Sequence, residues 1–237
     1  MHGSPPADAD PERFEPGKLP DLPAELALAR LPGGRHGLPR SFVARNQRLR
    51  IVSAMLRVLP QHGYAETTIG HLTREAGVSR SSFYSQFGSK EECFLTTYDI
   101  AAEWLCDRVE EAAAAAGQWP SRVRAGVSEA MRLLAANHEL AHLIAVEALQ
   151  AGSFARRRRQ RCIVRLAETL RADRPRSAEL PADLEELLVG GVFAHVARCV
   201  DDGNVDLLAD ATAELVHYLL IPYLDPAESR RIADQAA

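Results

Sequence analysis

Residues 77–87, which read Gly-Val-Ser-Arg-Ser-Ser-Phe-Tyr-Ser-Gln-Phe, decide the fold of this chain. Gly77 can adopt the left-handed backbone conformation that ends a helix, and Ser79 can cap the free N–H groups of the next helix. Phe83 and Phe87 lie four positions apart, so they form one apolar side and leave the polar side chains on the other faces. The stretch predicts a tight turn and then a short helix whose polar surface suits a groove of DNA.

The segment before this turn predicts a second helix. Residues 68–76 place Ile69, Leu72 and Ala76 at the 3.6-residue period of a buried helical face. Two helices that meet at a glycine turn form a helix-turn-helix. An ordinary helical hairpin inside a protein core is the alternative interpretation.

The run from Thr68 to Phe87, followed by the sequence Gly-Ser-Lys-Glu-Glu-Cys-Phe at 88–94, resembles the DNA-binding motif of the TetR family of transcriptional regulators. The resemblance assigns to DNA the residues Thr68, Ser79, Arg80, Ser81, Ser82, Tyr84, Gln86 and Lys90. Positions 80–82 would read base edges, and positions 68, 84, 86 and 90 would hold the DNA backbone. The family more often has histidine at position 86 and alanine at position 73, so the contacts there would differ in detail.

The charge distribution agrees with a DNA-binding segment. The whole chain has a formal charge of −4, but residues 40–90 contain 8 basic and 2 acidic side chains, or +6, which leaves −10 for the remainder. A first helix is predicted from residue 41 to about residue 62, with Gly63 as its stop. Arg45 and Arg48 lie opposite its apolar stripe and are predicted phosphate contacts, although a solvated arginine face is the alternative.

Residues 1–40 predict an irregular N-terminal extension, because they hold 8 of the 14 prolines and 5 of the 15 glycines. The end of this extension, residues 31–40, is basic and lies next to the predicted DNA-binding helices. It could enter the minor groove as a flexible arm. A solvated tail is an equally good interpretation.

From residue 91 onward the apolar positions follow only helical periods, so the chain is predicted to be all-α. We expect a three-helix DNA-binding domain at 41–90, with its motif at 68–87, and a larger helical domain at 91–237. The TetR resemblance implies that the larger domain binds a small, largely apolar effector and pairs with its copy in a homodimer. It further implies a repressor that leaves a near-palindromic operator in double-stranded DNA. Candidate ligand-binding residues are Trp104, His142, Glu147, Phe154 and His195.

Two motifs point to other functions. His138, Glu139 and His142 match the HExxH pattern of zinc hydrolases, in which two histidines bind the metal and the glutamate is the base. A third ligand does not follow convincingly, so we expect no bound metal and no catalytic residues. Residues 156–161 contain five arginines, which form either a second nucleic-acid patch or a solvated helical face.

Other classes of protein are excluded by composition. An apolar run long enough to cross a bilayer is missing, and so is the apolar core of a signal peptide, so we expect a cytoplasmic protein without membrane contact. The four cysteines are widely spaced and predict buried thiols, with redox sensing as a further option. We expect a regulator that is not an enzyme and needs no cofactor. An architectural DNA-binding protein without an effector is the rival interpretation.

Overall fold

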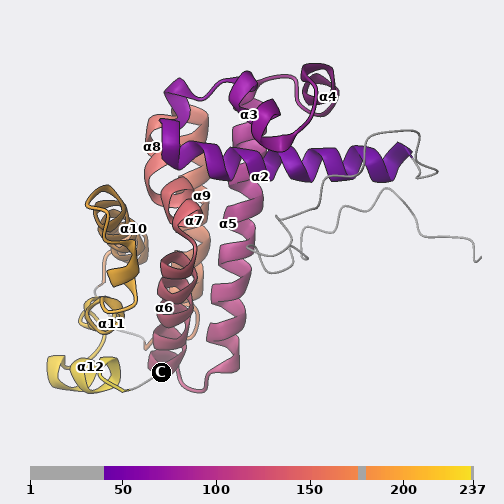
Figure 1. Ribbon diagram of the computed structural model, residues 1–237. Helices are drawn as coiled ribbons and strands as arrows, with labels where there is room; N and C mark the ends of the chain where they lie inside the picture. The colour runs from indigo at the N-terminus through magenta and orange to yellow at the C-terminus, as the bar shows by residue number, and fades with distance from the viewer. Residues whose placement is uncertain (1–39, 176–179, 236–237) are drawn as a thin grey trace, which may run out of the picture.

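The computed structural model describes residues 40–175 and 180–235, and every regular element within these ranges is a helix (Figure 1). The predicted all-α fold class is therefore confirmed. The predictions of an irregular extension and a basic minor-groove arm concern residues that lie outside the described ones.

Three helices form the N-terminal part. They are α2 (Arg40–Glu66), α3 (Ile69–Ala76) and α4 (Arg80–Gln86). Thr68 caps α3 by accepting a 3.1 Å hydrogen bond from the His71 N–H, and Ser79 caps α4 by accepting one of 3.0 Å from the Ser82 N–H. Gly77 joins the two helices in the left-handed conformation, with φ 61° and ψ 42°. The predicted helix-turn-helix is present because each of its local signals acts where the sequence puts it.

The first helix breaks where the sequence predicts its stop. Gly63 has φ 67° and ψ 166°, a backbone conformation that is essentially restricted to glycine. Pro60 is accommodated inside the helix, so the interruption comes three residues later than a proline kink would place it. One further turn, up to Glu66, follows the break and leads into α3.

The long helix α5 (Lys90–Ala115) begins directly after α4. Ser89 accepts a 3.0 Å hydrogen bond from the Glu92 N–H, and the Glu92 carboxylate accepts one of 2.7 Å from the Gly88 N–H. This reciprocal pair resembles a capping box, except that the glutamate reaches the N–H one residue before the N-cap. With 26 residues α5 is about 39 Å long, so it runs the full length of the helical bundle (Figure 1).

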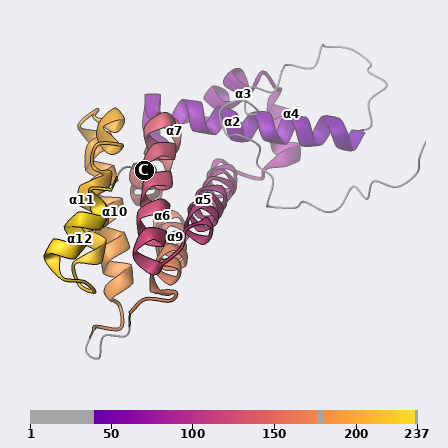
Figure 2. The same cartoon turned by 90° about the horizontal axis from the view of Figure 1, so that it is seen from below.

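The other helices complete the bundle. They are α6 (Trp119–Ala136), α7 (His138–Ala141), η1 (His142–Glu147), α8 (Ala148–Gln150), α9 (Ser153–Arg171), α10 (Leu184–Asp201), η2 (Val205–Leu208), α11 (Thr212–Leu220) and α12 (Pro226–Ala233). Of these, α6 and α9 pack directly against α5. Two stretches depart from the α-helical geometry: the wide π-helical turn η1 joins α7 to α8, and the 3₁₀ turn η2 precedes α11. Seen from below, α10, α11 and α12 lie on the side of α6 and α9 that faces away from α2, α3 and α4 (Figure 2).

One buried apolar cluster runs through all these parts. It starts at Ile51 in α2, includes Phe83 and Phe94, and reaches Ala233 in α12. The predicted division into domains at 41–90 and 91–237 stays a prediction, because this cluster continues across residue 90.

Candidate DNA-binding surface and apolar cavity

The outward face of α4 is polar and open to solvent. Arg80, Ser81, Tyr84 and Ser85 are exposed, and 54% of the Tyr84 surface is accessible. Phe83 and Phe87 are buried on the opposite side, with 0% and 1% exposed, and fix the helix to the core. A short helix held in this way can present its polar side chains to the major groove of DNA.

The serines of this helix are partly engaged with one another. The Ser79 Oγ lies 2.9 Å from the Oγ atoms of both Ser81 and Ser82, while the Ser85 hydroxyl donates a 2.8 Å hydrogen bond to the Ser82 carbonyl. The Arg80 side chain, in contrast, is exposed at the N-terminal end of α4. It is therefore the longest group that the predicted base-reading positions offer to a ligand.

Arg45 and Arg48 share a helix but differ in environment. Arg45 is exposed on α2, as a phosphate contact requires. Arg48 turns inward: its Nη1 donates a 2.8 Å hydrogen bond to the Gln86 carbonyl, and its guanidinium lies 4.3 Å from the centre of the Phe87 ring. In this conformation Arg48 braces the end of α4 instead of facing solvent. Its predicted contact with phosphate would require the side chain to leave these partners.

Arg50 is a positioning residue that the sequence did not indicate. Its Nη2 donates hydrogen bonds to the carbonyls of Ala76 and Gly77, the latter at 2.9 Å. Arg57, about two helical turns further on, forms a 2.6 Å ion pair with Glu75. Basic residues of α2 therefore hold α3 and the turn in place, whereas an arginine face alone suggested only phosphate binding.

Lys90 is also turned inward. Its ammonium donates hydrogen bonds to the carbonyls of Tyr64, Ala65 and Thr67, at 2.7, 3.3 and 2.8 Å, and lies 4.3 Å from the centre of the Tyr64 ring. These carbonyls belong to the turn between Gly63 and α3. All three donors of the ammonium are thus used to join the start of α5 to this turn.

An apolar cavity of about 100 Å³ lies inside the bundle. Its walls come mainly from α5, α6, α9 and α10, including Leu105, Val109, Ala113, Val123, Met131, Leu134, Ile144, Leu166, Val189, Phe193 and Val196. The polar groups at one end already have partners: Trp119 donates to the Leu170 carbonyl at 2.8 Å, and Arg122 pairs with Asp173 at 2.6 Å. The cavity can therefore take an apolar group, and it has no free polar partner at that end.

Comparison with known proteins identifies the family. Residues 51–97 match the family described as bacterial regulatory proteins, tetR family. Residues 51–97 are therefore a TetR-family segment. The match begins within α2 and ends within α5, so it includes the complete helix-turn-helix and a part of each of the two helices that flank it.

Among relatives of this chain is the fatty acid metabolism regulator protein of Bacillus subtilis strain 168, which is 23% identical over 103 residues. These residues are 44% of this chain and 53% of the relative, so the chain spans about half the length of the curated relative that it matches. Two solved structures share the fold. FadR of Bacillus subtilis in complex with stearoyl-CoA has a TM-score of 0.64 at 18% identity, and covers 72% of this chain and 96% of its own. FadR of Bacillus halodurans has a TM-score of 0.65 at 19% identity, and covers 73% and 94%.

The five side chains predicted to shape a ligand pocket are not among those that line the apolar cavity. Trp104 is buried on α5, while Phe154 is 53% exposed beneath the Arg157 guanidinium. His195 lies 3.0 Å from an Arg198 nitrogen, and burial lowers the pKa of its imidazole. The lining is set instead by the aliphatic faces that converge from several helices. Their contact with a ligand stays a prediction.

His142 and Glu147, the other two of these residues, lie between the bundle and the helix-turn-helix. The Glu147 carboxylate is 1% exposed and accepts a 2.8 Å hydrogen bond from the Tyr64 backbone N–H. The His142 Nδ1 lies 3.4 Å from its other oxygen. Burial raises the pKa of Glu147 and lowers the pKa of His142, so both groups favour their neutral forms more than they would in water.

The HExxH motif is divided between two helices. His138 and Glu139 lie in α7 and are exposed, whereas His142 begins η1; the two imidazole rings stack with their centres 6.3 Å apart. The described residues contain no cluster of three or more histidine, cysteine, aspartate or glutamate side chains that could hold a metal ion. The zinc-hydrolase alternative therefore lacks a third ligand in this part of the chain.

The arginine run lies on α9 and faces the acidic side of α5. Arg158 pairs with Asp99, and Arg165 pairs with Asp107 and, at 2.7 Å, with Glu110. Within the run itself, Arg158 and Arg161 share the single carboxylate of Asp99, so the ion pairs of the described residues offset only part of the charge that suggested a second nucleic-acid patch. None of the helices in residues 40–175 and 180–235 is long and apolar enough to cross a membrane.

Proposed function

We propose that this TetR-family chain is a homodimeric repressor that leaves a near-palindromic operator when a small, largely apolar ligand fills the cavity. Its main support is the path of α5. This helix starts at Lys90, which is bonded to the turn before α3, and lines the cavity further along with Leu105 and Val109. A movement of α5 caused by a ligand would therefore be transmitted to the helix-turn-helix.

DNA would be bound by the outward face of α4 and the exposed part of α2. Arg80 would read base edges in the major groove, while Arg45 and Tyr84 would contact phosphates. The charge of +6 over residues 40–90 would attract the DNA backbone, and the acidic remainder of the chain would be repelled by it.

The ligand must change the shape of the bundle in order to bind. The cavity measures about 100 Å³. This is smaller than the roughly 150 Å³ that holds a single benzene molecule, so a longer apolar compound would have to push the helices apart. A compound that binds the expanded form more tightly would lower the affinity of the protein for its operator. By linkage, bound operator would lower the affinity for the compound by the same factor, about 5- to 150-fold for typical coupling. Because FadR of Bacillus subtilis was solved with stearoyl-CoA, fatty acyl compounds are the first to test.

The second subunit would bind to α10 and α11. These helices expose large apolar side chains, with 67% of Leu187, 39% of Tyr218 and 45% of Ile221 accessible. Tyr218 lies over Gly191, where an added Cβ would be only 2.5 Å from the tyrosine oxygen, so the two helices approach closely there. An apolar surface of this kind is typical of a subunit interface. Pairing would place two copies of α4 side by side, to read two half-sites about one DNA turn apart.

The test is to select operator sequences from random duplexes with the purified chain and then titrate acyl compounds against the complex. We expect a near-palindrome whose affinity falls when an acyl compound is added. An architectural DNA-binding protein would select no defined sequence and would ignore the ligand. Selective binding that no apolar compound weakens would overturn the proposed ligand switch and leave the DNA-binding function standing.

A further inference from the structure

Tyr98 on α5 buries a hydroxyl group that has no partner. The side chain is 0% exposed, and its hydroxyl forms no hydrogen bond within the part of the chain that the structure describes. Buried hydroxyls are normally paired, because leaving one without a partner costs free energy. The phenol stays protonated, since burial raises the pKa of Tyr98 well above its usual range. It is therefore a hydrogen-bond donor without an acceptor.

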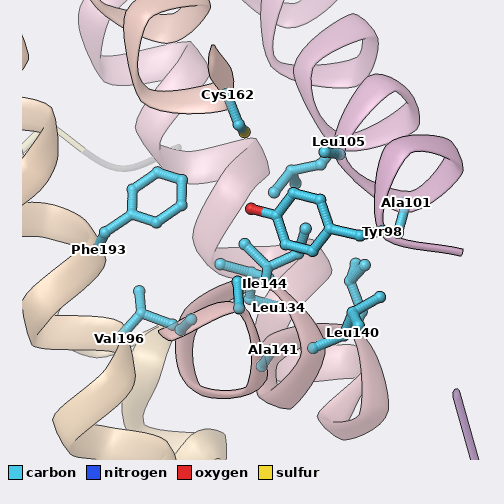
Figure 3. Packing of buried hydrophobic residues seen from close by; sticks show 14 of the residues in the cluster. Tyr98, Ala101, Leu105, Leu134, Leu140, Ala141, Ile144, Cys162, Phe193 and Val196 are labelled. Atoms are coloured by element: carbon cyan, nitrogen blue, oxygen red, sulfur yellow. The ribbon is translucent and has the colours of Figure 1, made fainter. Parts of the chain in front are cut away.

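This hydroxyl points to one end of the apolar cavity. In Figure 3 the Tyr98 oxygen is directed away from α5 towards Phe193, with Cys162 on one side and Ile144 on the other. Phe193 and Ile144 also line the cavity, as do Leu105 and Val196, which are drawn around the same space. If the helices move apart to admit a ligand, the cavity would extend past Phe193 and reach the Tyr98 hydroxyl.

Arg159 on α9 is the second unpartnered group at this end. Its guanidinium lies 5.0 Å from the centre of the Phe193 ring, and its Nε is buried without a hydrogen bond in the described residues. Burial lowers the pKa of Arg159, while the nearby Tyr98 and Cys162 act in the opposite direction. Arg158 and Arg165 on the same helix are paired with carboxylates, whereas no ion pair to Arg159 is formed within residues 40–175 and 180–235. A half-buried guanidinium that has no carboxylate partner would be stabilised by a bound anion, so Arg159 is a candidate anion-binding group.

We propose that the Tyr98 hydroxyl and the Arg159 guanidinium bind the oxygen-bearing end of an acyl compound whose apolar chain occupies the cavity. The hydroxyl would donate to one acyl oxygen, and the guanidinium would bind the second oxygen of a free carboxylate or the phosphates of a thioester carrier. Arg159 is only half-buried, so its guanidinium lies where the ligand end would meet solvent. The opposite end of the cavity, at Trp119, has polar groups that are already hydrogen-bonded or ion-paired, and it would hold the terminal methyl end of the acyl chain.

This inference rests on the proposed ligand site, so binding is measured directly and without DNA. The probes are decanoate, decanoyl-CoA and decanol, titrated against the full chain by calorimetry. We expect decanoate or decanoyl-CoA to bind about tenfold or more tightly than decanol, because only these two offer an acyl oxygen. Whichever of the two binds better identifies the natural form of the acyl group. Equal affinity for decanol would overturn the proposal.

Two variants test the residues. Tyr98→Phe and Arg159→Met should each weaken acyl binding about tenfold and leave decanol binding unchanged. Arg157→Met is the matched control, since this arginine of the same helix lies over the exposed Phe154. Variants that bind the acyl probe as tightly as the wild type would refute the assignment.

Operator release is then measured separately. An acyl compound that releases the operator equally well from Tyr98→Phe would refute this site alone and leave the ligand switch intact. Acyl binding that depends on both residues but leaves operator affinity unchanged would refute the switch and leave the site intact.

Discussion

The Glu147 carboxylate accepts a 2.8 Å hydrogen bond from the backbone N–H of Tyr64, 83 positions earlier in the chain. The carbonyl of the same tyrosine accepts a 2.7 Å hydrogen bond from the Lys90 ammonium, and its ring packs edge-on against Phe94 with the ring centres 4.8 Å apart. The turn after Gly63 is therefore held from both sides, by η1 and by the start of α5. A ligand-induced shift of either element would reach the helix-turn-helix through this turn.

Replacement of Glu147 separates its hydrogen bond from its charge. Glu147→Ala should lower the free energy of unfolding by about 1–3 kcal/mol, because the Tyr64 N–H loses its buried partner. Glu147→Gln keeps an acceptor and removes the cost of burying a charge. Both are measured by urea unfolding. An unchanged stability of Glu147→Ala would contradict the role of this contact.

The same pair of variants predicts a pH dependence. Burial raises the pKa of Glu147 above its ordinary value of 4.5, so the folded chain holds this proton more tightly than the unfolded chain. The stability that protonation provides is complete below that value and is lost as the pH rises through the raised pKa. The wild type should therefore lose stability relative to Glu147→Gln over this window. A difference that does not vary with pH would show that Glu147 does not titrate there.

Lys90→Ala tests whether this ammonium holds the turn or the DNA. Because it is bonded to three carbonyls, we expect a lower melting temperature and an unchanged slope of operator affinity against salt concentration. Arg45→Ala is the control, since Arg45 is exposed on α2. A slope that falls by about one unit in Lys90→Ala would instead make this residue the phosphate contact that the family resemblance implies.

The helix-turn-helix could be predicted from sequence because its signals are local. Thr68, Gly77 and Ser79 each act within four residues of the atoms that they cap. The inward roles of Arg48 and Lys90 could not be predicted, since they depend on carbonyls 38 and 23 positions away. The sequence places a basic side chain on the polar face of a helix whether it binds a DNA phosphate or a carbonyl of its own chain, so the two roles cannot be told apart from sequence.

The cavity was beyond sequence reasoning for a related reason. Its lining is made by aliphatic residues from several helices, and each of these residues is indistinguishable from ordinary core until the helices are assembled. The Cys106 and Cys162 sulfurs, 3.4 Å apart, illustrate the same limit, because 56 residues separate them in the chain. Wide spacing predicted buried thiols correctly for three of the four cysteines, while Cys199 is half-exposed.

Arg80→Ala should relax the choice of base at one operator position by about 1–3 kcal/mol, because this side chain is the longest group at the base-reading positions. Arg45→Ala should instead weaken binding to all duplexes alike. Competition between the operator and single-position variants measures both. Uniform weakening by Arg80→Ala would make Arg80 another phosphate contact.

The cysteines should differ in reactivity. Burial raises the pKa of Cys93 to about 12, and the hydrogen bond with Cys162 together with burial raises the pKa of Cys106. Since the thiolate is the reactive form, native protein should react with iodoacetamide at Cys199 alone. Mass spectrometry would find one adduct, lost in Cys199→Ser, and four adducts after unfolding. Rapid native labelling of Cys106 would show that α5 and α9 separate readily.

The last prediction concerns the proposed interface on α10 and α11. Leu187 exposes 67% of its surface there, so Leu187→Glu would place a charge in a contact that excludes water and repel the same charge on the second subunit. We expect a monomer of 26.0 kDa where the wild type sediments at twice that mass. Leu149→Glu is the control, because this leucine is 44% exposed on α8, away from the proposed interface.

The loss of dimers should also weaken operator binding, since a single α4 engages one half-site and the second half-site no longer adds to the affinity. The weakening should diminish on an operator that contains only one half-site, because the wild type then gains nothing from its second subunit. A Leu187→Glu chain that remains dimeric would move the interface away from this surface. A monomer that binds the complete operator as tightly as the wild type would show that pairing is not needed for recognition.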